Sequence, residues 1–476
     1  MTATEMRFTD WKPIPWRLSI AGNRPMQWVC MGCILWMCLW GSFTVHAEAS
    51  PEPEAGPVID TVIVRGNHLT KPFVILNEIS LAHGIRATDA RLKENRDRLN
   101  SLNLFSRVEL STDSAVDTST LQINVTELWY IWPGFYLSVE EEDWTRSTYG
   151  LRVEHFNFRG RRESLSVSTW TGGADGGLIE WQIPYLFQGK NWYMEWAARA
   201  NFESDPLYIA RSDGLNTRHA SLYVETGRWL DLQRNFGIRL GVEMLHFTPL
   251  EDGSTVNATS GDDDRLGVIS FHHALDTRHY QPWADQGYYA VARVEFARSL
   301  DGPEIAYIRP SFSLSRYIRI SNRFIIAGQG RVGYTFGDSP AYRRYISNRT
   351  ESLIRTGRDR LLEGNRFGRL SLEWRSDLLE RRYFGIPMFD PVNDYTRDLF
   401  LGISHVFFAD LAGIGGADET ANDPTGAIDK DGWDLGYGTA VVLHIPYLQI
   451  VRFEVARSAR FPDDGITFRA RIGAMF

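Results

Sequence analysis

The sequence predicts a mostly β protein, in which an antiparallel membrane β-barrel of about 16 strands follows one small α+β domain. Three observations favour this fold class. Beyond Glu127, apolar and polar residues alternate, as in strands with one apolar and one polar face. No later apolar run approaches the ~18 residues of a membrane helix. The chain also begins with an export signal, although the exported part contains no cysteine for disulfides.

Residues 1–47 have the three parts of a secretory signal peptide. Four basic residues precede the apolar run 28–43, and a small-residue cleavage site ending at Ala47 follows it. A single membrane anchor is the alternative, but 16 residues are short for a membrane span. A lipoprotein signal is less favoured still, because Cys30 stands where the lipobox before Cys33 requires leucine.

Removal of this leader changes the chemistry open to the protein. All 3 cysteines lie within it, so the exported chain has no disulfide, no thiol nucleophile and no cysteine zinc site. Loss of four basic and two acidic residues changes the formal net charge from -8 to -10. A negative chain is a poor nucleic-acid binder. Residues 48–57, EASPEPEAGP, are expected to be an acidic, proline-rich spacer.

Residues 58–127 predict a small two-layer domain with the order β-α-α-β-β. The first strand ends at a Gly-Asn pair after Arg65, and a helix is expected from Pro72 to Gly84. Thr88 is placed as the N-cap of a second helix. The alternating segments FSRVELST and STLQINVTE supply the last two strands.

Residues 128–476 predict the barrel. Three segments show the alternation: IRLGVEM (238–244), ARVEF (292–296) and GRVGYTF (330–336). Alternation alone also suits a soluble sandwich. Export without disulfides, strands rich in Trp and Tyr, and the lack of long apolar runs favour a closed barrel with its apolar face outward. At roughly 20–22 residues per strand with its connection, this region holds about 16 strands.

The first domain resembles a POTRA domain. The resemblance rests on VIDTVIVRGN with its Gly-Asn pair, on LNSLNLFSRVELST at the entry to the second strand, and on the closing LQINVTE. The later segments resemble, in order, the barrel of the bacterial surface antigen family: FNFRGRRESLSVSTW with QIPYL, DTRHYQPWADQGYY, GNRFGRLSLEWR and HVFFADLAG. This family includes BamA-like and TamA-like outer-membrane assembly factors and two-partner secretion transporters. The resemblance covers residues 58–476.

The resemblance implies a surface loop folded back into the lumen, whose tip arginine pairs with acidic residues on the two following strands. The matching position selects Arg355, with Glu373 and Asp410 as partners. A planar guanidinium can bind two carboxylate oxygens at once. Arg358 is the rival, and a solvated loop arginine is the third alternative. The family's glycine and aromatic residue after the arginine are both missing here. The connection at 376–398 is also longer than an ordinary turn.

No cofactor or metal is expected. The acidic loops 260–267 and 415–434 suggest calcium, but the second lacks the oxygen spacing and distal glutamate of a calcium loop. Both are expected to be solvated surface loops. His272 and His273 are neighbours in a strand, so they point to opposite faces and cannot share a metal. A nucleophile elbow, a phosphate loop and a metal-binding helix motif are all missing, and an enzyme is not expected.

The resemblance implies an outer-membrane protein of a Gram-negative cell, with its POTRA domain in the periplasm. Its expected clients are unfolded outer-membrane or secreted polypeptides, which it helps to insert or export through a barrel seam or pore. Periplasmic or lipoprotein accessory factors and outer-membrane lipid are further partners. The client-binding edge is placed on the second strand of the POTRA domain, at Phe105, Arg107, Val108 and Leu110. The alternative is a passive pore or structural barrel whose POTRA domain docks a periplasmic partner.

The chain ends on ITFRARIGAMF, a strand with one apolar and one polar face. In a closed barrel this strand must pair with the first strand, near residues 132–140. Its apolar side is expected to face lipid. Phe468, Ile472 and Phe476 resemble the C-terminal signal by which assembly machinery recognises outer-membrane clients.

Overall fold

A computed structural model describes most of the chain beyond the leader. The described residues are 56–115, 118–140, 143–187, 191–204, 216–248, 257–259, 261–278, 283–346, 361–385, 399–416, 428–429, 432–445, 449–462 and 465–472. The expected signal peptide, most of the spacer, Arg355, Arg358 and Phe476 lie outside these residues.

The N-terminal domain has the expected β-α-α-β-β order. Its elements are β1 (Thr61–Arg65), α2 (Pro72–Leu76), α3 (Asp89–Ser101), β2 (Phe105–Ala115) and β3 (Thr118–Glu127). The sheet order is β1-β3-β2, with β1 parallel and β2 antiparallel to β3. Thr88 caps α3, since its hydroxyl accepts a hydrogen bond from the backbone N–H of Arg91 at 3.3 Å.

The first helix is shorter than the sequence predicts. α2 ends at Leu76 rather than near Gly84. The chain leaves the helix because later backbone groups find partners elsewhere. The N–H of Ser80 donates to the Asn95 side chain at 2.6 Å, and the N–H of Gly84 donates to the carbonyl of Ile59 at 2.8 Å. Among the described residues, no helix has the length and apolar composition to cross a membrane.

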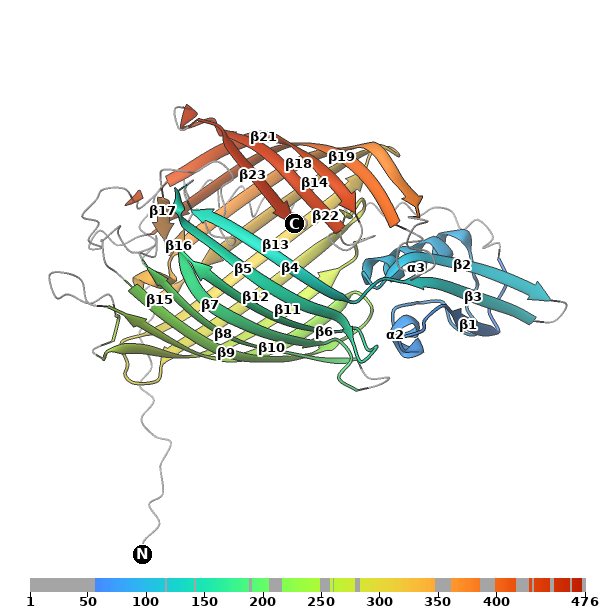
Figure 1. Cartoon of the computed structure of the whole chain (residues 1–476), viewed down its shortest axis with the longest axis horizontal. Helices are drawn as coiled ribbons and strands as arrows, with labels where there is room; N and C mark the ends of the chain where they lie inside the picture. Colours follow the sequence, from blue (N-terminus) through green and yellow to red (C-terminus); the bar gives the residue numbers. More distant parts are fainter. Residues whose placement is uncertain are drawn as a thin grey trace, which may run out of the picture.

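The rest of the chain forms a closed β-barrel beside this domain (Figure 1). Its strands are β4 (Ile131–Glu140), β5 (Asp143–Phe158), β6 (Glu163–Gly172), β7 (Ala174–Ile183), β8 (Trp192–Ser204), β9 (Asn216–Trp229), β10 (Arg234–Phe247), β11 (Asp263–Asp276), β12 (Gly287–Ser299), β13 (Ala306–Arg319), β14 (Phe324–Tyr334), β15 (Phe336–Asp338), β18 (Arg366–Phe384), β19 (Leu399–Gly415), β21 (Gly432–Ile445), β22 (Gln449–Ser458) and β23 (Thr467–Ile472). β14 and β15 both pair with β13 and share one position, so the 17 elements of the described barrel fill 16 positions. The predicted strand number is confirmed.

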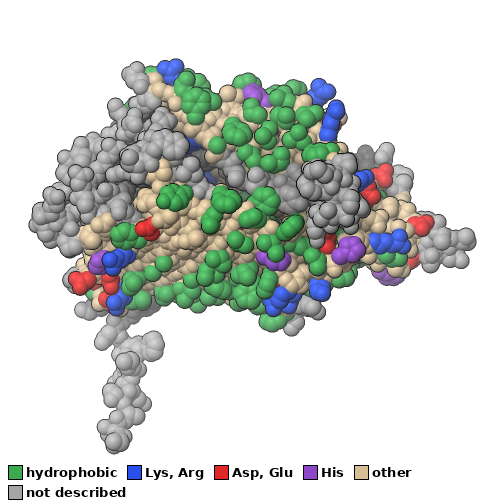
Figure 2. Space-filling view, viewed as in Figure 1, with side chains coloured by type: hydrophobic (Ala, Val, Ile, Leu, Met, Phe, Trp, Pro, Cys, Tyr) green, Lys and Arg blue, Asp and Glu red, His purple; other side chains and the backbone are tan. Residues whose placement is uncertain are grey.

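Apolar side chains gather on the outer flank of the barrel, while charged side chains lie mainly at its ends (Figure 2). On β22 the alternation is sharp: Phe453 is 50% exposed, whereas its neighbours Arg452 and Glu454 are each 2% exposed. The closed order gives each strand a neighbour on both sides, so backbone groups pair within the wall, as a bilayer requires. This excludes the soluble sandwich and supports the membrane barrel.

A small second sheet lies at the end of the barrel away from the N-terminal domain (Figure 1). It consists of β16 (Tyr345–Ile346), β17 (Leu361–Gly364) and β20 (Ile428–Asp429), and a 3₁₀ turn, η2 (Ala341–Arg343), precedes it. β17 pairs with both β16 and β20. The sheet therefore joins the connection after β15 to the connection after β19.

The β18–β19 hairpin is the longest in the barrel and contains two irregularities in its register, between Asp377 and Arg382. β18 continues to Phe384, and β19 begins at Leu399. Part of the connection expected at 376–398 is thus strand. Near the end of the paired region, Tyr383 and Phe400 pack edge to face, with ring centroids 6.2 Å apart.

Candidate functional site

Strand β2 forms one edge of the N-terminal sheet. It lies at the end of the order β1-β3-β2, so among the described residues β3 is its one strand neighbour. Phe105 and Val108 point into the domain core, whereas the side chain of Arg107 is half exposed and pairs with Glu109 at 2.5 Å. Leu110 packs at the border of the core. The outer N–H and C=O groups of an edge strand can bind another extended chain.

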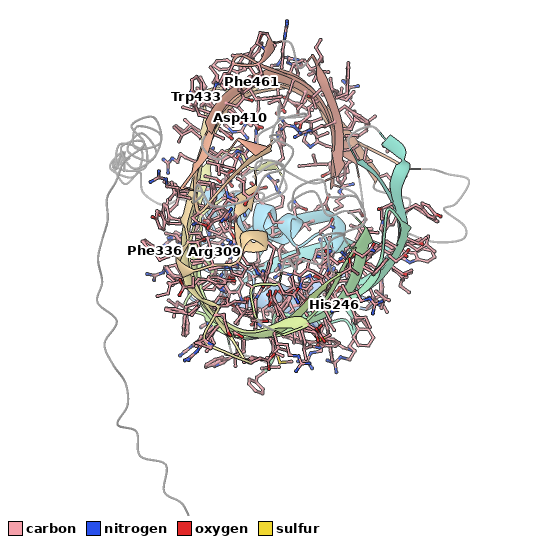
Figure 3. The ribbon with its side chains drawn as sticks, turned by 90° about the vertical axis from the view of Figure 1, so that its left-hand side faces the viewer. His246, Arg309, Phe336, Asp410, Trp433 and Phe461 are labelled. Carbon is pink, nitrogen blue, oxygen red and sulfur yellow. The ribbon has the colours of Figure 1, made fainter. Side chains whose placement is uncertain are left out.

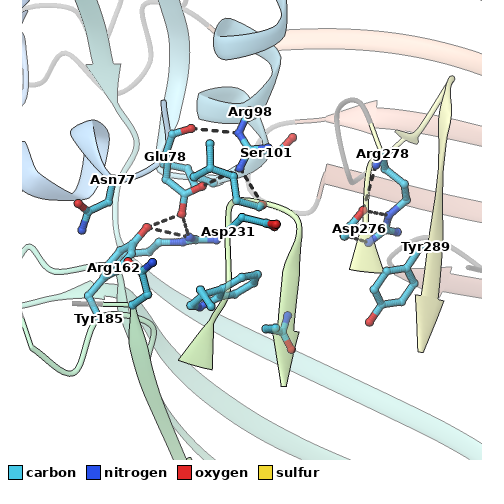
Figure 4. Close-up of a pocket in the computed structure, with 15 residues that line it drawn as sticks. Asn77, Glu78, Arg98, Ser101, Arg162, Tyr185, Asp231, Asp276, Arg278 and Tyr289 are labelled. Atoms are coloured by element: carbon cyan, nitrogen blue, oxygen red, sulfur yellow. Dashed lines mark hydrogen bonds and ion pairs between the residues drawn. The ribbon is translucent and has the colours of Figure 1, made fainter. Parts of the chain in front are cut away.

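The N-terminal domain is attached to the rim of the barrel through Glu78, which follows α2. The carboxylate accepts hydrogen bonds from Arg162 Nη1 at 2.5 Å and from the hydroxyl of Tyr185, and it lies 3.9 Å from Arg98 Nη2 (Figure 4). Arg162 belongs to the β5–β6 turn, and Tyr185 follows β7. Burial and the nearby carboxylate raise the pKa of Tyr185, so its hydroxyl stays protonated and donates.

A second attachment is centred on Thr70. Its backbone N–H donates to the carboxylate of Glu127 at 2.7 Å, and its hydroxyl lies 2.9 Å from both Tyr130 Oη and Asn157 Nδ2. Tyr130 lies between β3 and β4, and Asn157 belongs to β5. Glu127 is the last residue of the POTRA-like segment LQINVTE. No role was predicted for it from the sequence.

Gly160 completes this attachment. Its carbonyl accepts a hydrogen bond from the N–H of Lys71 at 2.8 Å. Its φ is +69°, and a Cβ at this position would lie 2.1 Å from the carbonyl oxygen of Leu69. Glycine is therefore required for both conformation and space.

The attachments leave a cavity of about 460 Å³ between α3 and the neighbouring rim of the barrel (Figure 4). Arg98 reaches across it to donate to the carbonyl of Leu232, in the β9–β10 turn, at 3.0 Å. Tyr130 and Tyr185 are buried in the same apolar core as the domain's own residues. The domain and the barrel rim thus share one core, and the edge strand β2 has a defined position at the mouth of the barrel.

Glu373 and Asp410, the expected partners of the loop arginine, lie together on the inner wall. In the β18–β19 register, Glu373 is opposite Phe408 and Asp410 is opposite Ser371, so the two acids are diagonal neighbours on one face. Both are fully buried. Figure 3 looks into the barrel from the end away from the N-terminal domain and shows Asp410 on the inner side. The two expected arginines, Arg355 and Arg358, are outside the described residues.

Three arginines of the barrel wall surround these acids. They were not predicted as partners from the sequence. Glu373 accepts hydrogen bonds from Arg375 Nε and Arg452 Nη1, each at 2.9 Å, and Arg369 lies 3.9 Å from Asp410. Arg452 also donates to Glu454 at 2.9 Å. Each charge in this buried network therefore has an opposite charge close by, as a low-dielectric site requires.

Arg375 has a further set of contacts. Its guanidinium lies 4.4 Å from the ring centroid of Trp283 and 5.3 Å from that of Tyr317. Part of this network could have been predicted from the sequence. In VRFEVAR (451–457) the alternation places Arg452 and Glu454 on one face of the strand.

The barrel closes where β23 meets β4. β23 is 6 residues long and pairs with β22 from Thr467 to Ile472. Phe468 is 70% exposed on the outer surface, whereas Thr467 is buried on the inner side. Two of the three residues expected in the C-terminal signal thus lie on this closing strand, and Phe476 lies outside the described part.

Within the described ranges, no three His, Cys, Asp or Glu side chains are grouped so that they could hold a metal ion. His272 bonds to Tyr193 Oη through Nε2, at 3.1 Å. The described side chains of the inner wall offer ion-pairing chemistry.

Comparison with known proteins agrees with this architecture. Residues 57–128 match the family model described as POTRA, surface antigen variable number repeat. The structure is similar to that of BamA from Haemophilus ducreyi lacking POTRA domains 1-3, with a TM-score of 0.51, 16% identity, and coverage of 88% of this chain and 84% of that one. It is also similar to CdiB from Escherichia coli, with a TM-score of 0.53, 12% identity, and coverage of 88% and 77%. A search of curated proteins finds no significant match.

At such low identity the two structures show a shared fold. Together with the POTRA match, they confirm the resemblance inferred from the sequence. The chain has one POTRA domain followed by a BamA-like barrel.

Proposed function

We propose that this protein is an outer-membrane factor that helps to insert or export other polypeptides, with its POTRA domain in the periplasm. The observation that carries the proposal is the open edge of β2, held at the mouth of a closed membrane barrel by the Glu78 and Thr70 attachments.

The proposed mechanism begins at this edge. An unfolded outer-membrane or secreted polypeptide adds to β2 as an extra strand through backbone hydrogen bonds, which do not depend on its side chains. The barrel seam between β23 and β4, or the lumen, then supplies the route into or across the membrane. This mechanism requires neither a catalytic group nor a nucleotide. Periplasmic or lipoprotein accessory factors would bind the remaining surface of the POTRA domain.

We also propose that the loop arginine, Arg355 or its rival Arg358, joins the acids Glu373 and Asp410. The support is the position of both acids on one buried inner face, where arginines are already their partners. An additional guanidinium there would connect the loop to the wall.

Crosslinking can test the client edge. Photo-crosslinking residues at Arg107 and Glu109 place the probe on exposed side chains of β2, unlike the buried Phe105 and Val108. Gln122 is the matched control, because it belongs to the central strand β3, which has a neighbour on each side. We expect crosslinks to nascent outer-membrane or secreted proteins from the two β2 positions and few from Gln122. Equal yields at all three positions, or none, would contradict the proposal.

A passive pore or structural barrel is the second candidate. The contacts between the POTRA domain and the barrel rim favour this second candidate, because a domain held in a fixed position can dock a periplasmic partner. Depletion of the protein separates the two functions. Loss of particular barrel proteins or secreted substrates from the outer membrane supports the assembly function. An unchanged outer-membrane protein content with altered small-solute permeability supports the passive pore.

A further inference from the structure

The lumen contains a second cavity, of about 390 Å³, on the wall formed by β12, β13 and β14. Tyr345, from the segment that follows β15, and Phe367 of β18 complete its lining. Their rings pack together with centroids 4.5 Å apart. Gly333 permits this packing, because a Cβ there would lie 2.6 Å from Tyr345 Oη and 2.4 Å from the Phe367 ring.

The lining is strongly basic. Each of the three strands contributes one arginine, Arg293, Arg309 and Arg331, and among the described residues Glu295 is the one acid of the lining. In register, Arg309 is opposite Glu295 and Arg293 is opposite Ser311, so these side chains share the inner face. Figure 3 shows Arg309 on the inner side of the wall.

Other luminal arginines have carboxylate partners. Arg239 lies 2.7 Å from Glu225, and Arg452 lies 2.9 Å from Glu373. In the described part of the chain, neither Arg293 nor Arg309 has a carboxylate within ion-pair distance. Glu295 instead accepts a hydrogen bond from Tyr307 Oη at 3.2 Å.

Arg309 is held in place without being neutralised. Its Nε donates to Thr335 Oγ1 at 3.2 Å, and its guanidinium lies 4.7 Å from the ring centroid of Tyr345. Its Nη2 and the Nε of Arg293 are buried without an acceptor among the described residues. Buried donors of charged groups that lack an acceptor are unfavourable.

We propose that this cavity is a binding site for an oxyanion such as phosphate or sulfate. The planar guanidinium groups of Arg293 and Arg309 match the geometry of such oxygens, and Arg331 adds positive charge. Ser311 and Ser313 of the lining supply hydroxyl donors beside them. The occupant is a soluble ion rather than a lipid headgroup, since the cavity opens on the luminal side of the sheet and the bilayer contacts the opposite face. The proposal does not depend on the client-handling function.

The test is phosphate binding by the full chain folded in detergent. Equilibrium dialysis with labelled inorganic phosphate should show one saturable site per chain. Thermal unfolding at constant ionic strength should shift upward by a few degrees when phosphate replaces chloride, since a ligand that binds the native state stabilises it. Arg293→Gln and Arg309→Gln should each abolish the saturable binding and this shift. Arg199→Gln, a barrel arginine that stacks on Trp170, should retain both.

A shift that persists unchanged in all variants would overturn the proposal, because phosphate also stabilises proteins generally by exclusion from their surface. An absence of saturable binding to the native chain would overturn it as well. Glu295→Gln should change the phosphate affinity in the opposite direction. It removes the acid among the described lining residues, so phosphate should bind more tightly. Each variant is first checked for heat-shifted mobility on gels.

A competition experiment distinguishes a soluble ion from a lipid headgroup. Vesicles of phosphatidylglycerol should displace no labelled phosphate, whereas displacement would assign the site to lipid headgroups and contradict the soluble ion.

Discussion

Glu78, which follows the first helix of the POTRA domain, accepts a hydrogen bond from Arg162 in a turn of the barrel 84 residues later in the chain. Both side chains are largely shielded from water. The contact joins two units that the sequence pattern reveals separately, and it determines where the edge strand β2 lies relative to the barrel mouth.

Glu78→Ala should loosen the POTRA domain from the barrel. The change removes the acceptor of Arg162 and Tyr185 and leaves the guanidinium without its carboxylate, for a loss of about 1.5–3 kcal/mol. Hydrogen exchange of the backbone amides of Thr70 and Lys71 should become faster. Glu109→Ala removes an exposed ion pair of the same domain and should leave the exchange unchanged. Equal exchange in the two variants would show that Glu78 does not hold the domain.

Gly160→Ala should disturb the second attachment. The new methyl group would meet the carbonyl of Leu69 at 2.1 Å in a left-handed backbone conformation, and such strain is unfavourable by about 1–3 kcal/mol. Proteolysis near residues 128–130 should become faster while the barrel keeps its heat-shifted mobility. Gly177→Ala is the control, because a Cβ there lies 3.5 Å from its nearest neighbour. If the two alanine variants are cleaved at the same rate, the close approach at Gly160 is unimportant.

The attachment should also withstand alkali. Burial raises the pKa of Tyr185 above the ordinary value of 10.0. A group whose folded-state pKa is raised contributes stability below its unfolded-state pKa and loses it as pH rises through the folded-state value. We therefore expect the amide protection around Thr70 to persist at pH 10 and to fall at higher pH. Tyr185→Phe should show lower protection at neutral pH, with less further loss in alkali. A midpoint near pH 10 in the wild type would be contrary to this expectation.

Glu373→Gln should impair barrel assembly more than the loss of one ordinary ion pair. Both carboxylate oxygens accept hydrogen bonds from buried arginines, so neutralising the acid removes a carboxylate charge beside Arg375 and leaves Arg452 paired with Glu454, at a loss of about 3–5 kcal/mol. Asp410→Ala should act in the same direction. The readouts are heat-shifted gel mobility and the urea midpoint of unfolding. Glu154→Gln removes a less buried luminal acid and should have a much smaller effect. Unchanged mobility in both Glu373 and Asp410 variants would refute the proposed loop lock.

The sequence predicts the alternation within each strand and the order of the strands. It predicts contacts between side chains of distant strands less well. Alternation within single strands predicted strands with one apolar and one polar face, because Phe453 and Arg452 must point to opposite faces of any strand. The choice of a barrel over a sandwich also needed the export signal without disulfides and the lack of long apolar runs. The pairing of Arg452 with Glu373, 79 residues away, depends on register across several strands, which single-strand patterns do not contain. The early end of α2 has the same origin, since Asn95 of another helix binds the backbone of Ser80. The Glu78 attachment likewise joins segments whose separate patterns carry no sign of contact.

Deletion of Phe476 should reduce membrane insertion in cells before it affects the stability of the folded barrel. The closing strand β23 pairs with β22 over Thr467–Ile472, so these pairs do not include the last residue. A recognition signal acts on the unfolded client, whereas a structural residue acts on the folded state. The deletion variant should therefore accumulate unfolded in the periplasm yet, once refolded in detergent, unfold at nearly the wild-type urea concentration. Phe453→Ala, which removes an exposed outer side chain of the neighbouring strand β22 and lies outside the proposed signal, serves as the comparison. An equal loss of urea stability and of insertion on deleting Phe476 would assign it to barrel closure instead of recognition.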